Sequence, residues 1–303
     1  MALEYSPAQI QETDTPERVA RTVALLRRRG YALSPARLGA VCAGGALTEQ
    51  EVRRAVATSA HLTISHDLVV ERDHTPRVEA ILARANGHEA ASPEYMAMTR
   101  RFVRLLLAAA PFVRSVWIAG SLASGGFRDS DDVDLNLVVD DGHRHLAYVA
   151  VNALGLLHAL RHRGKPVDDL TRRPIAPRLM TANLILERSQ IAPLARQDEG
   201  MAFELLVSQP VYGFDVFEQI VALNRGLTRH FPQLATREAP PLVEPPAATL
   251  PRLLYPAWLD GAARVLGSGA WRYMQWTRRH RPEALARVAF VRETMRPYTL
   301  FDA

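Results

Sequence analysis

The sequence predicts an α+β protein built around a small mixed sheet with helices, preceded by a unit of three helices and a hairpin and followed by a helical C-terminal domain. Two observations support this prediction. Apolar segments that fit buried strands occur at residues 113–119, 133–139 and 179–186, and segments with helical periodicity lie between and around them. The proline-rich stretch 240–246 then has the composition of a linker before the last helical region.

The bulk composition is that of a soluble globular protein with two or three domains. The chain has 303 residues, of which 48% are hydrophobic and 23% charged, so a sizeable core can form without disulfides or structural metal. Cys42 is the only cysteine, which indicates a reducing compartment. No secretory start is visible at the N-terminus, and the longest apolar stretches are too short to span a bilayer. We therefore expect a cytoplasmic protein with no membrane partner.

The formal net charge is +5, and the basic side is almost entirely arginine, with Lys165 as the single lysine. Guanidinium groups suit phosphate-bearing ligands because they donate paired hydrogen bonds to phosphate oxygens. The excess is small for a chain of this length, and a preference for arginine can also follow from the base composition of a genome. A nucleic-acid partner is therefore possible but not favoured, and the oligomeric state stays open.

Residues 1–90 show the element order of a winged-helix domain, with three predicted helices followed by two short strands at residues 61–71. Helix-start signals occur at Thr15-Pro16, at Ser34-Pro35 and in the capping box that begins at Thr48. Domains of this kind often bind DNA. The third predicted helix offers only Arg53 and Arg54 to phosphates, so we favour a packing module over a DNA-binding one.

Residues 91–235 are expected to form a second domain and residues 236–303 a helical third one. Ser92-Pro93-Glu94 fits the start of a helix that runs to about residue 110, and helical spacing predicts another over residues 143–163. Aromatic residues of the last domain are expected to pack as a helical cap over the cleft of the second. They are Tyr255, Trp258, Trp271, Tyr273, Trp276 and Phe290.

The segment most informative about chemistry runs from the first predicted strand into Gly120-Ser121 and on to the second strand, which opens with Asp132-Val133-Asp134. Side chains alternate along a strand, so both aspartates point to the same side, with Cα atoms about 6.6 Å apart at normal strand rise. Two carboxylates placed in this way can converge on divalent cations. Magnesium prefers carboxylate oxygens and leaves coordination positions for phosphate oxygens.

The residues before the aspartate pair fit the phosphates of a ligand. Gly120 allows the backbone to approach a ligand closely. Ser121, at the start of a short helix, can offer its hydroxyl and its backbone N–H to terminal phosphates. A solvated acidic turn does not account for two carboxylates at the start of an apolar strand. A calcium loop built on Asp129, Asp131 and Asp132 lacks the glycine and the distal glutamate of an EF-hand.

This arrangement resembles the DNA polymerase beta-like nucleotidyltransferase superfamily, whose signature is a strand, Gly-Ser, roughly ten residues and an Asp-apolar-Asp pair. Ten residues separate Ser121 from Asp132 here. The resemblance covers about residues 30–235 and extends to further motifs of one bacterial and archaeal branch. Those motifs are Asn183, Glu204-Leu205, Gln209-Pro210 with Gly213, Asn224 and Phe231-Pro232.

The resemblance implies a magnesium-dependent enzyme, also served by manganese, that transfers a nucleoside monophosphate from an NTP to an acceptor and releases pyrophosphate. It makes Asp132 and Asp134 the metal ligands, and Asp132, Asp134 and Asn183 the catalytic residues. It also places the nucleotide at four positions around the motif. These are Gly120, Ser121, Ser124 and Arg128.

The third carboxylate of the superfamily is where this sequence departs from the pattern. Asn183 occupies the matching position, and an amide can ligate a metal but cannot act as a base. Asp168, Asp169 and Glu187 are the other candidates nearby. If none of them serves, the acceptor must be activated by metal alone, or activity is weak or lost.

Several further residues are weaker candidates for ligand binding. Arg172, Arg173 and Arg178 precede the third strand and could neutralise phosphate, although each is more often a plain surface residue. His158 and His162 are one helical turn apart, which allows a metal pair but is more typical of a solvated face.

The sequence does not name the acceptor or the nucleobase. We expect a small-molecule acceptor, because the modest charge does not favour a long nucleic-acid track and the helical tail could close a pocket. The alternative is a catalytically weak or inactive nucleotide sensor whose first domain binds DNA.

Overall fold

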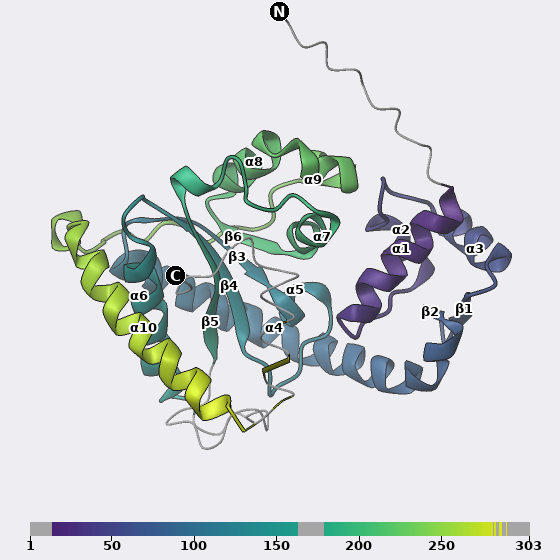
Figure 1. The fold of residues 1–303 in the computed structure, drawn as a ribbon, viewed down its shortest axis with the longest axis horizontal. Coiled ribbons are helices and arrows are strands. Elements are labelled where there is room, and N and C mark those ends of the chain that lie inside the picture. The colour runs from purple at the N-terminus through teal and green to yellow at the C-terminus, as the bar shows by residue number, and fades with distance from the viewer. Residues whose placement is uncertain (1–13, 163–178, 281, 283–284, 287–288, 290–303) are drawn as a thin grey trace, which may run out of the picture. The chain divides into compact units, whose positions relative to one another are not determined.

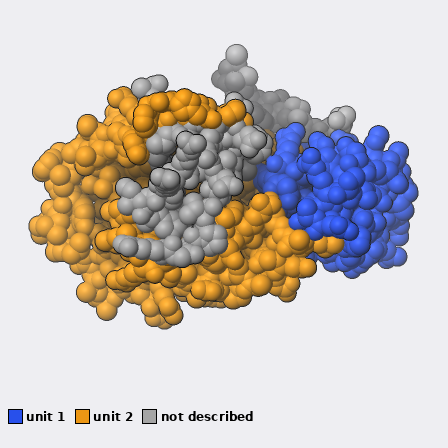
Figure 2. All heavy atoms as spheres, turned by 90° about the horizontal axis from the view of Figure 1, so that it is seen from below, with its two compact units in different colours: residues 1–81 blue, residues 82–303 orange. Residues whose placement is uncertain are grey.

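The computed structural model describes residues 14–162, 179–280, 282, 285–286 and 289. The chain divides into two compact units, residues 1–81 and 82–303 (Figure 2). The division falls after Ile81, and residues 236–303 belong to the second unit.

The first unit is a small helical bundle with a hairpin. Its elements are α1 (Thr15–Arg28), α2 (Pro35–Ala40), α3 (Glu49–Thr58), β1 (Leu62–Ser65), β2 (Leu68–Glu71) and the 3₁₀ helix η1 (Arg72–Arg77). The expected capping box is present, because the Thr48 side chain accepts from the Glu51 backbone N–H and the Glu51 carboxylate accepts from the Thr48 N–H. Thr15, part of the predicted helix start, is the first residue of α1, and the preceding Asp14 makes no side-chain cap bond.

The second unit is built on a four-stranded mixed sheet, as the sequence predicts for the fold class (Figure 1). The strands lie in the order β5-β4-β3-β6, with β4 and β5 parallel and the other pairs antiparallel. Their bounds are β3 (Val113–Ala119), β4 (Val133–Val139), β5 (Met180–Glu187) and β6 (Gln209–Tyr212). The short helix α5 (Gly120–Ser124) directly follows β3.

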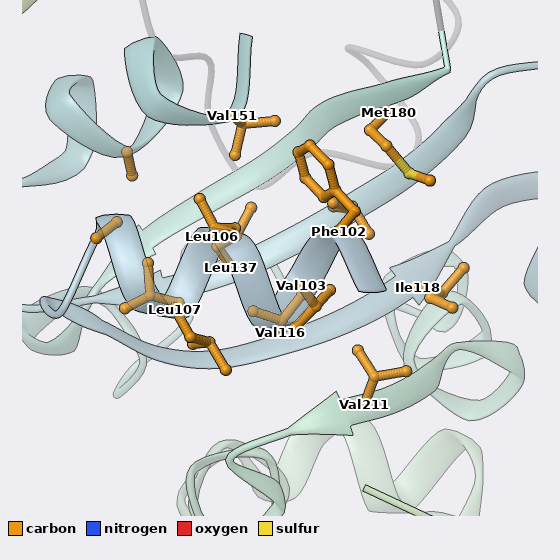
Figure 3. Close-up of a cluster of buried hydrophobic side chains, with 14 of the residues drawn as sticks. Phe102, Val103, Leu106, Leu107, Val116, Ile118, Leu137, Val151, Met180 and Val211 are labelled. Atoms are coloured by element: carbon orange, nitrogen blue, oxygen red, sulfur yellow. The ribbon is translucent and has the colours of Figure 1, made fainter. Parts of the chain in front are cut away.

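Helices cover both faces of this sheet. On one face α4 (Val78–Ala109) and α6 (Arg144–Ala159) contribute Phe102, Leu106 and Val151 to a buried cluster with Leu137 of β4 (Figure 3).

On the other face of the sheet, the indole of Trp117 meets the ring of Phe217 edge-on, with 5.8 Å between the ring centroids. On that face α7 (Glu199–Val207) and α8 (Phe214–Leu223) contact β3, and α9 (Arg225–His230) packs on these two helices. The remaining elements are η2 (Arg188–Gln190), η3 (Pro232–Thr236), η4 (Arg252–Leu254) and α10 (Trp258–Arg278).

The expected helix start at residues 92–94 is wrong, because Pro93 lies inside α4. A proline within a helix removes one backbone hydrogen bond and normally ends or kinks it. Here tertiary contacts hold the helix on either side of the proline. Ala91 and Tyr95 pack against the buried cluster, and the Arg84 side chain is bonded to the backbone at Gly126. Packing overrides the local signal that the sequence carries.

The tail aromatics are also not packed as expected. Trp258, Tyr273 and Trp276 of α10 are 73%, 65% and 56% exposed, so they do not form a buried cap. Tyr255 does pack, with its ring 5.2 Å from that of Phe112 and its hydroxyl donating to the Ala109 carbonyl. Phe290 lies outside the described residues. In the described part of the chain, no helix is long and apolar enough to cross a membrane.

The carboxylate of Asp260, in the first turn of α10, docks this helix on α6. Residue 143, at the N-cap of α6, makes no side-chain cap bond. Instead Asp260 Oδ1 accepts from the backbone N–H groups of His145 and Leu146, at 2.7 and 2.8 Å. Its Oδ2 lies 2.7 Å from His145 Nδ1. A residue distant in sequence thus caps α6, with a negative charge at the positive end of the helix dipole.

This cap makes part of the stability dependent on pH. Burial on its own would raise the pKa of Asp260, but hydrogen bonds from the His145 side chain and from backbone N–H groups outweigh it and hold the pKa below its usual value of 3.8. A carboxyl with a lowered pKa in the folded state stabilises that state above the unfolded-state pKa. The contribution is lost as the pH falls through the folded-state pKa.

We expect Asp260→Ala to lower the free energy of unfolding by about 1–2 kcal/mol at neutral pH, the size of a lost helix cap. Urea titration measures this change, and the gap to wild type should close as the solution becomes more acidic than pH 3.8. Asp215→Ala is the matched control, because Asp215 is an exposed first-turn aspartate of α8. Equal losses in the two variants would contradict the assigned cap.

Candidate active site

The Gly-Ser turn places backbone directly against a carboxylate. β3 ends at Ala119, and Gly120 turns the chain into α5 with a φ of +65°, in the left-handed region that favours glycine. A Cβ built on Gly120 would lie 2.2 Å from Asp134 Oδ2. No side chain fits in that space. Gly120 is therefore required by its own backbone conformation and by the position of the Asp134 carboxylate.

Asp134 is held by the two strands that flank β4. It pairs with Ala119 of β3 on one side and with Thr181 of β5 on the other. The Thr181 hydroxyl donates to Asp134 Oδ1 at 3.2 Å. One carboxylate oxygen thus has a side-chain donor and the other faces the glycine backbone, which fixes the carboxylate orientation.

Asp132 immediately precedes β4, whose first residue is Val133. It is partly exposed, and its carboxylate has no hydrogen-bond or ion-pair partner among the described residues. The structure therefore places Asp132 and Asp134 at the same end of one strand, with one carboxylate fixed and the other without a protein partner. Oxygen pairs of this kind are ligands suited to a hard divalent cation.

The position beside the aspartate pair on β5 is taken by neutral side chains. Thr181 lies opposite Asp134, whereas Asn183 is the extra residue where the β4–β5 register shifts. Its Nδ2 donates to Asn136 Oδ1 at 3.0 Å. From the sequence, Asn183 was the predicted match for the third carboxylate. In the structure, however, Thr181 is the residue next to Asp134.

Glu187 cannot supply a third ligand, because it pairs with Val139 at the far end of β4, about 17 Å along the strands from Asp134. Its carboxylate also accepts from the Gly142 backbone N–H at 3.0 Å. Asp168 and Asp169 lie outside the described residues, as do Arg172, Arg173 and Arg178.

The two serines of α5 differ in what they offer a ligand. Ser124 Oγ donates to the Gly120 carbonyl at 2.8 Å, so this hydroxyl closes the helix turn. Ser121 is partly exposed, and its hydroxyl has no side-chain partner in the region that the structure describes. Of the two, Ser121 is the one whose hydroxyl is available to a ligand.

The acidic residues that precede Asp132 and Asp134 differ in their contacts. Asp131 Oδ2 accepts from the Arg128 backbone N–H at 3.2 Å and lies 3.9 Å from an Arg84 nitrogen, so Asp131 shapes the loop. Asp129 and Arg128 are exposed. Among the described residues the Arg128 guanidinium has no hydrogen-bond or ion-pair partner, so it is available to a ligand.

Two other groups could have held a metal, and the structure favours neither. Glu71, Asp73 and His74 lie together, but Glu71 is paired with Arg27 at 3.0 Å and Asp73 with His74 at 3.0 Å. The rings of His158 and His162 do lie close together, with centroids 4.9 Å apart and the planes tilted by 43°. Burial lowers the pKa of His158, and the charges of His162 and Arg161 lower it further. No carboxylate joins this pair within the described residues.

Sequence reasoning missed the polar neighbours of the aspartates. Asn136, 6% exposed, continues the alternation of Asp132 and Asp134 along β4, and that signal is visible in the sequence. Thr181 carries no such signal, because its role depends on the β4–β5 register. Comparison with protein-family models, with curated proteins and with solved structures gave no match.

We expect Gly120→Ala to displace the Asp134 carboxylate, because the new methyl group would lie 2.2 Å from Oδ2, and so to disrupt the aspartate pair as a cation ligand. Gly142→Ala is the matched control. Gly142 also has a positive φ, +74°, but its Cβ would meet only the Ala257 methyl group at an ordinary 3.4 Å. Both variants carry the left-handed strain of about 1–2 kcal/mol. Titration calorimetry with magnesium should separate them, and equal binding by both variants would contradict this role of Gly120.

Proposed function

We propose that this chain is a magnesium-dependent nucleotidyltransferase that moves a nucleoside monophosphate from an NTP to a small-molecule acceptor. One observation supports this above the others. Two segments that are separated in the sequence come together where β3 ends and β4 begins, and they carry Gly120, Ser121, Asp132 and Asp134. The glycine packs on one of the carboxylates. The proposal also draws on the resemblance of these residues to the DNA polymerase beta-like superfamily.

The residues fit a divalent cation. The carboxylates of Asp132 and Asp134 are the ligands in this proposal, and oxygen donors of this charge suit magnesium or manganese. Bound there, the ion supplies charge stabilisation for the triphosphate and for the pyrophosphate that leaves. Thr181 keeps Asp134 in one orientation through its 3.2 Å hydrogen bond.

The nucleotide is held mainly by polar groups of the turn. Ser121 offers a hydroxyl without a protein side-chain partner among the described residues, and the exposed Arg128 supplies the nearby positive charge. In the reaction, an acceptor oxygen or nitrogen forms a bond to the α-phosphorus. The bond from that phosphorus to the bridging oxygen breaks, and pyrophosphate carries away the electron pair. The acceptor proton leaves to solvent or to a base.

Among the described residues of β5, no base stands beside the two carboxylates. Thr181 and Asn183 occupy β5 beside the carboxylates, and neither side chain accepts a proton at neutral pH. A site with two carboxylates depends more heavily on positioning and charge stabilisation than on proton transfer. Of the described residues, none next to Asp134 on β5 replaces the missing carboxylate.

A DNA-binding nucleotide sensor is the competing function. In the first unit, Arg53 of α3 is paired with Glu49 at 2.7 Å and with Asp67 at 3.1 Å, so its charge is engaged within the protein. That leaves exposed Arg54 on this helix. These contacts favour the enzyme over the sensor, and we do not extend the proposal to DNA.

We expect isothermal titration with the four NTPs to give magnesium-dependent binding of at least one of them. Asp132→Asn and Asp134→Asn should each weaken that binding at least about tenfold, since each removes a charged ligand. Turnover with a competent acceptor should fall by orders of magnitude, because charge stabilisation dominates phosphoryl transfer. Asp129→Asn, a change at an exposed aspartate of the same acidic run, is the matched control and should bind as wild type does.

The outcomes separate the two functions. Binding that is lost in the aspartate variants and kept in Asp129→Asn supports the enzyme and names the donor. Binding without metal dependence, or unchanged in Asp132→Asn, overturns the proposal. Salt-sensitive DNA binding without any turnover of an NTP would favour the nucleotide sensor over the enzyme.

A further inference from the structure

We infer that Arg84 and His88 of α4 are positioning residues of the site, acting through residues 125–131, here termed the motif loop. This inference rests on the proposed function, because it concerns how Asp132 is set in place. Neither residue belongs to the sequence motif. Both lie on the turns of α4 that precede its internal proline, far upstream of the aspartates in the chain.

Arg84 binds the motif loop at two points. Its Nε donates to the Gly126 carbonyl at 2.5 Å, and its Nη2 lies 3.9 Å from Asp131 Oδ2. The side chains of Arg84 and Asp131 are only 18% and 12% exposed, so the pair is largely shielded from water. Asp131 in turn accepts from the Arg128 backbone N–H. The guanidinium therefore connects the start of the loop to its end.

His88 binds the loop one helical turn further along α4. Its Nδ1 accepts from the Phe127 backbone N–H at 3.2 Å. The Phe127 ring is fully buried and lies 4.5 Å from the Tyr95 ring, again on α4. Residues 84, 88 and 95 recur at helical spacing, so a single face of the helix holds the loop.

The start of the motif loop needs external support, whereas its end is held in part by the hydrogen bonds between Asp131 and Arg128. Gly125 and Gly126 begin it, Gly125 has a φ of +99°, and glycine loses more conformational freedom on ordering than any other residue. Asp132 comes directly after the loop and has no side-chain partner among the described residues. Its carboxylate is therefore aimed by the backbone of the motif loop, which α4 holds.

The first experiment compares Arg84→Met with Arg104→Met, an exposed arginine of the same helix. Calorimetry and steady-state kinetics with magnesium and the NTP that wild type binds give the dissociation constant, KM and kcat. We expect Arg84→Met to raise the KM for the magnesium nucleotide between about 10- and 100-fold, the scale of a small misplacement of a site group. Arg104→Met should match wild type.

A second comparison separates positioning from general stability. His88→Asn keeps an acceptor at the δ1 position, whereas His88→Leu removes it. Hydrogen exchange of the motif-loop amides should rise in His88→Leu and return toward wild type in His88→Asn, with KM following the same order. In a double-mutant cycle, Arg84→Met combined with Asp131→Asn should be less damaging than the sum of the two single changes, since both disturb one contact.

Each result bears on one claim. Suppose that wild type binds the magnesium nucleotide and that Arg84→Met and His88→Leu change only the melting temperature. That result overturns the positioning role and leaves the proposed function intact. Wild type that binds no NTP overturns the proposed function. In that case, faster hydrogen exchange of the motif-loop amides in the variants would show that α4 holds the loop, but that the loop serves no nucleotide site.

Discussion

The contact between Gly120 and the Asp134 carboxylate is the constraint on which the site depends. It requires β3 to end in a left-handed turn, and it requires β4 to pair with β3 in the register that puts Asp134 opposite Ala119. A slip of one residue would carry Asp134 to the other face of the sheet, among the side chains that pack on α4. The buried alternation of Val133, Leu135 and Leu137 prevents that slip, so the hydrophobic core fixes the position of a charged group.

The parts of the fold that follow from local physics could be predicted. The α+β class and the buried strands β3, β4 and β5 follow from the apolar segments, and the capping box at Thr48 follows from residue type. Prediction from local sequence patterns was wrong where long-range packing determines the structure. Pro93 is carried inside α4, and the N-terminal end of α6 is capped by a carboxylate 115 residues away in the sequence. No local pattern encodes either feature.

The candidate site divides in the same way. Spacing alone brought Gly120, Ser121, Asp132 and Asp134 to attention, because alternation along a strand determines which side chains share a face. The partners of those residues depend on tertiary contacts. Thr181 follows from the register of parallel strands, and the α4 clamp follows from a helix that approaches the loop from an earlier part of the chain. The sequence therefore indicated the chemical groups, while the structure supplies what orients them.

The register shift in β5 also bears on how the chain can vary in length. Ala182 pairs with Leu135 and Leu184 with Asn136, so Asn183 is an insertion that the ladder absorbs at one point. Deleting it would leave every neighbouring pair in its present alignment and Thr181 still beside Asp134. Insertion or deletion of one residue anywhere else in β5 would turn its buried side chains outward. Asn183 is therefore the position in this strand where related sequences could gain or lose a residue while the sheet stays intact.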